Sequence, residues 1–111
     1  MSIHKNDSRK LTPGEISLAK SIFKKSVNYA GIKIHKGSYF PFNLQNVDTA
    51  ATPNGDMYFM PKHYQADFSG AVPTYQPWFI HEMTHVWQYQ SGLKVKMRGF
   101  LSVPFSRRNL P

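Results

Sequence analysis

The sequence predicts an α+β fold in which a small, mostly antiparallel sheet packs on an N-terminal helix and on a second, central helix. Three observations lead to this class. A helix start with a capping box stands at Thr12 to Glu15, and short alternating segments separated by turn residues fill the middle of the chain. A longer helical segment then ends at Gly92, with apolar residues around most of its circumference.

Length and composition favour one folded domain. The chain has 111 residues, of which 41% are hydrophobic and 14% aromatic, which suffices for a single modest core. We expect residues 1–10 to form a flexible N-terminal tail and residues 11–111 to form the domain. The start of the chain is polar, so we expect no signal peptide, and no run of 18 apolar residues predicts a membrane span.

The distribution of the formal net charge of +8 along the chain is more informative than its size. No acidic residue follows Glu82, whereas the C-terminal third contains five cations: Lys94, Lys96, Arg98, Arg107 and Arg108. Such a surface favours anionic partners such as nucleic acid, acidic lipid or acidic cell-wall polymer. We favour the simpler interpretation of a solvated basic surface. No nucleic-acid-binding motif is present, so no specific nucleic acid partner is expected.

The first helix is predicted over residues 13–27. Thr12 is the expected N-cap, Pro13 occupies the first turn, and Glu15 at the third helical position completes a capping box. Apolar residues then recur with helical spacing and should face the sheet: Ile16, Ala19, Ile22 and Phe23.

Short strands are predicted next, at residues 32–35, 49–52 and 57–60. The last two should form a hairpin around Asn54 and Gly55, a pair that tolerates positive φ at both central turn positions. Residues 39–42 are aromatic but contain Pro41, which favours a loop or an edge segment. A short helical turn is expected at residues 64–68.

The central helix is predicted over residues 77–91, with Pro77 in its first turn and Gly92 as its stop. Phe79, Met83 and Val86 are among the apolar residues that should bury it near the centre of the fold. Residues 93–98 alternate between apolar and basic side chains, as in a strand.

The central helix contains the motif His81-Glu82-Met83-Thr84-His85. Two histidines four positions apart lie on one face of a helix, where both imidazoles can bind a single zinc ion. Glu82 is offset by one residue, so it can act as general base on a water bound to the metal. This is the HExxH pattern of zinc peptidases, and Gln88 is near enough in sequence to orient the ring of His85.

The third zinc ligand is not evident. The chain has no cysteine, and no Asp, Glu or His follows His85, so a ligand from this chain must lie upstream. We rank His63 and Asp67 first because the intervening linker lets them fold back, ahead of the other candidates: Asp56, Asp48 and His35. The ligand can also come from another chain or be missing. The competing interpretation of the motif is a buried His-Glu-His cluster that hydrogen bonds satisfy without metal.

Several segments resemble a known family. They are residues 11–16, 27–42 and 51–55 and, most specifically, residues 79–90, which include the HExxH motif. Over residues 11 to 100 the chain is similar to zincin-like metallopeptidase domains associated with bacterial Rhs and Vgr proteins. The family's third ligand is a glutamate on a later helix, and this chain ends before such a helix. The resemblance therefore predicts a domain truncated at its C-terminus.

The resemblance implies a zinc-dependent peptidase that hydrolyses a peptide or amide bond, with His81 and His85 as zinc ligands and Glu82 as general base. It implies an antibacterial effector that is cytoplasmic in the producing bacterium and exported by type VI secretion to the periplasm of a target cell. Expected partners are a peptide or cell-wall peptide substrate, a Vgr spike protein and an immunity protein. The alternative is a degenerate zincin-fold domain without catalytic activity that acts as a basic binding module.

Overall fold

One mixed sheet organises the computed structural model, which describes residues 7–40, 45–70, 73–92 and 101–102. Within these ranges the strand order is β1-β2-β4-β3-β5. Strand β2 pairs with β4 in parallel, and the other three pairings are antiparallel. The predicted α+β class and mostly antiparallel sheet are thus observed. The strands are β1 (Asp7–Lys10), β2 (Lys33–Lys36), β3 (Ala50–Ala51), β4 (Met57–Phe59) and β5 (Leu101–Ser102).

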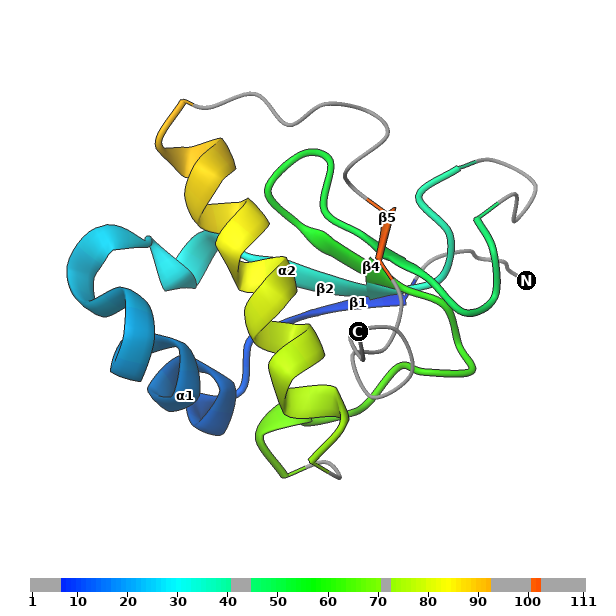
Figure 1. Ribbon diagram of the computed structural model, residues 1–111, viewed down its shortest axis with the longest axis horizontal. Helices are drawn as coiled ribbons and strands as arrows, with labels where there is room; N and C mark the ends of the chain where they lie inside the picture. The colour runs from blue at the N-terminus through cyan, green and yellow to red at the C-terminus, as the bar shows by residue number, and fades with distance from the viewer. Residues whose placement is uncertain (1–6, 41–44, 71–72, 93–100, 103–111) are drawn as a thin grey trace, which may run out of the picture.

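Two helices cover one face of this sheet. Helix α2 (Tyr75–Gln90) crosses in front of the strands, and α1 (Pro13–Phe23) lies at its side (Figure 1). Side chains from both helices and from the sheet share one core, in which Trp78, Phe59 and Phe68 are the largest fully buried residues. Within the described ranges, no helix has the length and apolar character that a bilayer span requires.

The N-terminal segment differs from the prediction, because residues 7–10 form strand β1 instead of part of a flexible tail. Strand β1 pairs with β2 over four residues, from Asp7 with Lys36 to Lys10 with Lys33. The side chain of Arg9 also anchors this strand, since it forms hydrogen bonds to Glu15 of α1 and to Tyr64. The sequence gives little sign of this strand, because its four residues are all polar.

Helix α1 begins as predicted and ends earlier. The capping box is formed: Thr12 accepts from the backbone N–H of Glu15 at 3.1 Å, and Glu15 accepts from the backbone N–H of Thr12 at 2.9 Å. The helix stops at Phe23 because Lys24 adopts a φ of 53°, and a 3-10 turn, η1 (Lys24–Ser26), follows. Ile22, predicted to face the core, is 52% exposed.

The hairpin between β3 and β4 forms, with Ala51 opposite Tyr58. Gly55 has a φ of +90°, but Asn54 is not in the positive-φ region, so the turn is not the two-residue type that the Asn-Gly pair predicts. The side chain of Asn54 instead accepts from the N–H of Asp56 and donates to the hydroxyl of Tyr58. A five-residue loop, residues 52–56, therefore connects the strands.

Helix α2 starts two residues before the predicted position. Pro77 is its third residue, a position at which the missing N–H costs no intrahelical hydrogen bond. The predicted stop is confirmed, since Gly92 has a φ of +87° and its N–H donates to the carbonyl of Tyr89. The prediction of a helical turn at residues 64–68 is wrong: residues 64–67 are not helical, and a 3-10 helix, η4 (Phe68–Gly70), begins only at the last residue of that range. The strand predicted at residues 93–98 lies outside the described residues.

Candidate functional site

The HExxH motif lies in the middle of α2, where the sheet face buries part of it. Glu82 is completely buried, and His81 and His85 are half-buried. The two imidazole rings are neighbours on the helix, with centroids 4.9 Å apart and planes nearly perpendicular at 87°. The predicted placement of both rings on one helix face is therefore present.

One ring nitrogen of His85 is held by a neighbouring side chain. Nδ1 of His85 lies 2.8 Å from Oε1 of Gln88, one turn further along α2, as the sequence predicts. Because an amide oxygen only accepts, Nδ1 carries the proton and Nε2 carries the lone pair. Nε2 is buried, and it is the one side-chain nitrogen or oxygen in the described ranges that is both buried and without a hydrogen-bond partner. Leaving such a group unsatisfied costs free energy, so this atom is suited to a metal ion.

The environment of His81 favours its uncharged form. Burial lowers the pKa of His81, and the neighbouring His85 lowers it further. Zinc binds a neutral imidazole, so the protein disfavours the protonation state that would compete with the metal.

The buried carboxylate of Glu82 receives a hydrogen bond from Thr52. This threonine follows β3, is itself 1% exposed, and donates from its hydroxyl to Oε1 of Glu82. Thr52 was not among the residues predicted for the site. No signal in the sequence distinguishes it from any other threonine next to a strand, because the contact joins residues thirty positions apart.

The predicted third ligands lie elsewhere. Within the part of the chain that the structure describes, no three His, Asp or Glu side chains come together in a way that could hold a metal ion. Both ring nitrogens of His63 form hydrogen bonds, one with the hydroxyl of Tyr75 at 2.7 Å and the other with Asp48 at 2.8 Å. Asp67 accepts from Thr12 and from the backbone N–H and the hydroxyl of Ser69. Both side chains therefore have a structural role.

The side chains of the lower-ranked candidates also form hydrogen bonds within the fold. His35 lies 3.1 Å from a carboxylate oxygen of Asp56 and stacks on Tyr58 with ring centroids 4.2 Å apart. The other carboxylate oxygen of Asp56 accepts from the backbone N–H of Lys33. The hydrogen bond from His63 is the largest of the contacts that lower the pKa of Asp48, followed by that from Lys62. None of these residues joins His81 and His85 as a third ligand.

Comparison with known proteins finds similarity to a curated sequence and to a solved structure. The chain is 42% identical over 92 residues to the type VI secretion system spike protein VgrG2b of Pseudomonas aeruginosa; the match covers 82% of this chain and 9% of that protein. The solved structure is the effector domain of the same VgrG2b, with a TM-score of 0.73 and 43% identity, covering 78% of this chain. No family model matches the sequence.

The match covers only part of each of these two proteins. The chain spans about half of the effector-domain chain, 48%, and about a tenth of the spike protein. At this level of identity, the agreement in sequence and in fold indicates common ancestry. The chain is therefore a homologue of part of the VgrG2b effector domain.

Proposed function

We propose that this chain is part of a type VI secretion effector of the Vgr-associated kind, and that α2 supplies the zinc site of a zincin-like metallopeptidase. Homology to an effector domain supports the first statement. The second rests on the HExxH motif and on one observation above all, the buried Nε2 of His85 that has no hydrogen-bond partner.

The tautomer of His85 explains why this observation favours a metal. Gln88 fixes the proton on Nδ1, which leaves the Nε2 lone pair directed into a buried position. A histidine cluster without metal would be expected to satisfy that atom with a donor. Nε2 of His85, with His81 as its partner, would therefore hold the metal ion.

Zinc in such a site lowers the pKa of a coordinated water towards about 7 and polarises the carbonyl group of the substrate. Glu82 is one residue from the first ligand, and burial together with the Thr52 hydrogen bond fixes its carboxylate. Its role is to accept the proton of the attacking water and to transfer it to the leaving amine.

Among the described residues, no third protein ligand joins His81 and His85. Of all His, Asp and Glu residues in the sequence, only His4 lies outside the ranges that the structure describes. A third protein ligand would therefore lie outside the described ranges, come from another chain or be missing. Two imidazoles alone leave room for water as further ligand, which predicts weaker binding than in a complete site.

The homology also suggests where the chain works. Under this proposal it is delivered by a Vgr spike into another cell, where it cleaves a peptide or a cell-wall peptide, and an immunity protein protects the producing cell. The basic surface near the C-terminus remains a prediction, because it falls outside the described residues.

Zinc titration of the purified chain tests the metal site. We expect one zinc ion per chain at micromolar supply, and loss of this binding in His81→Ala and in His85→Ala. His35→Ala is the matched control, because it also removes a half-buried histidine and should retain zinc. The measurement is equilibrium dialysis followed by metal analysis.

If the wild-type chain binds no zinc, or if His35→Ala loses zinc as fully as His85→Ala, the metal site is wrong. The degenerate basic binding module is then the interpretation left.

A further inference from the structure

The loop between β3 and β4 lies along α2 and contacts it on both sides of His85. At one end, Thr52 donates its hydroxyl proton to Glu82. At the other end, Gly55 lies so close to the ring of Tyr89 that a Cβ atom on this glycine would be 2.8 Å from Cδ2 of that ring. Glu82 and Tyr89 are seven residues, or about two helical turns, apart. In Figure 1 this loop is the green segment beside the yellow half of α2.

The hydrogen bond between Thr52 and Glu82 is shielded from solvent. Thr52 is 1% exposed and Glu82 is completely buried. A buried glutamate needs donors for its oxygens, and a hydrogen bond at low local dielectric is stronger than the same bond in water. The bond therefore fixes Oε1 of Glu82 and, since the carboxylate is planar, the direction of Oε2 as well.

The packing of Gly55 on Tyr89 determines how far the loop can move. The glycine backbone has a φ of +90°, and no Cβ atom separates it from the aromatic ring. The loop thus contacts the helix at two points: Gly55 packs on the ring of Tyr89, and the hydroxyl of Thr52 donates to Glu82. The loop therefore places Thr52 with little freedom relative to Glu82.

We infer that Thr52 is a positioning residue for Glu82, and that the β3–β4 loop holds it in place through the contact of Gly55 with Tyr89. This inference rests on the proposed function, because the orientation of the carboxylate matters for catalysis only if Glu82 is the general base. The contact itself is independent of the metal ion.

A pair of substitutions separates the hydrogen bond from the packing. Thr52→Val keeps the size of the side chain and removes the donor, whereas Thr52→Ser keeps the donor. The first measurement is the ¹³C signal of the Glu82 side-chain carboxyl in the metal-free protein, with the backbone amide spectrum as a check of the fold. We expect this signal to move in Thr52→Val and to stay near its wild-type position in Thr52→Ser. The same signal in all three proteins would overturn the inference.

The second measurement is hydrolysis of fluorescein-labelled casein by the zinc-loaded protein. Because a small misplacement of a catalytic group costs up to about a hundredfold in rate, we expect Thr52→Val to lower kcat roughly tenfold to hundredfold. KM should remain near the wild-type value, and Thr52→Ser should restore most of kcat. A change in KM alone would contradict a positioning role.

The two proposals fail in different ways. If Glu82→Gln abolishes hydrolysis and Thr52→Val leaves kcat unchanged, the positioning role is wrong and the peptidase proposal stands. If Glu82→Gln leaves hydrolysis unchanged, Glu82 is not the general base, whatever Thr52 does. The carboxyl signal decides whether Thr52 orients Glu82 even where casein is not cleaved.

Gly55→Ala provides a second variant in which Thr52 keeps its hydroxyl. A methyl group there would displace the loop from Tyr89, so the Glu82 carboxyl signal should move in the same direction as in Thr52→Val. Gly70→Ala is the control, because a Cβ atom at Gly70 meets no heavy atom within 4 Å. An unchanged signal in a folded Gly55→Ala protein would show that the loop contact does not place Thr52.

Discussion

Glu82→Gln is expected to lower the zinc-dependent hydrolysis of labelled casein about 10²- to 10⁴-fold, the range that general acid–base catalysis contributes. A neutral amide cannot accept the proton of the attacking water, so the reaction loses its base. The amide oxygen can still accept the hydrogen bond from Thr52, which should preserve the fold around the substituted side chain. Zinc binding should remain, because neither His81 nor His85 is altered.

The matched control for this substitution is Gln45→Glu, which introduces the reverse change at another buried position. Gln45 is 2% exposed and donates to the backbone carbonyls of Thr49 and Tyr58. Loss of its amide donors should destabilise the chain while the folded fraction keeps its rate of hydrolysis. Equal activity of wild type and Glu82→Gln at equal zinc content would rule out Glu82 as the general base.

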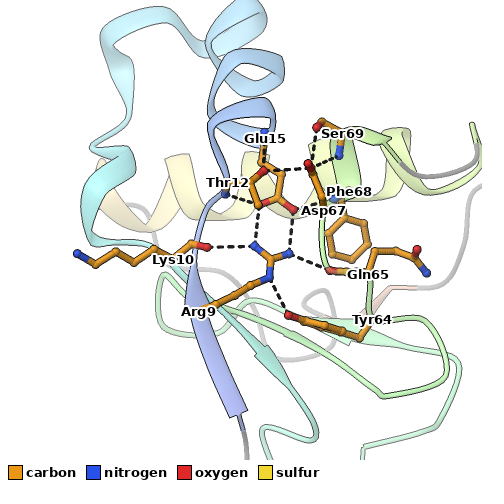
Figure 2. Close-up of polar contacts among 9 residues, drawn as sticks. All are labelled: Arg9, Lys10, Thr12, Glu15, Tyr64, Gln65, Asp67, Phe68 and Ser69. Atoms are coloured by element: carbon orange, nitrogen blue, oxygen red, sulfur yellow. Dashed lines mark hydrogen bonds and ion pairs between the residues drawn. The ribbon is translucent and has the colours of Figure 1, made fainter.

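Arg9→Met is expected to lower the free energy of unfolding by about 3 kcal/mol. Arg9 forms a two-pronged ion pair with the fully buried Glu15, with both N···O distances at 2.9 Å, and also donates to Tyr64 and to the carbonyl of Gln65 (Figure 2). Removing the guanidinium leaves the carboxylate of Glu15 buried without its cation. The value is at the low end of the range for buried pairs, because the Arg9 side chain is 21% exposed.

Urea denaturation followed by circular dichroism measures this loss. Lys10→Met is the control, because it removes the neighbouring cation of β1 from an exposed position and should change the stability by no more than about 0.5 kcal/mol. A midpoint for Arg9→Met equal to that of Lys10→Met would mean that the pair with Glu15 contributes nothing to stability.

Local sequence patterns predicted the elements that depend on local signals. The capping box gave the start of α1, and Gly92 gave the end of α2, because each acts through contacts within a few residues. The end of α1 was missed because a lysine, Lys24, adopts positive φ where a glycine is usual. Strand β1 was missed because its pairing with β2 and the partners of Arg9 are distant in sequence.

In the candidate site, too, only the contacts within one helix could be predicted from the sequence. Helical spacing placed His81, Glu82 and His85 together and brought Gln88 next to His85, since all four belong to one helix. The third ligand was not predictable, because the choice among distant side chains depends on tertiary structure. His63 and Asp67 have the right chemistry, but Tyr75, Asp48 and Ser69 already occupy their polar atoms.

The close approach of Gly55 to Tyr89 has a consequence for how homologous sequences vary. Asparagine is the usual replacement for glycine at positive φ, but its side chain would meet the ring of Tyr89. An asparagine at position 55 therefore becomes acceptable only after the residue at position 89 has become small. Substitutions at these two positions should accumulate in a fixed order during evolution, with the helix changing before the loop.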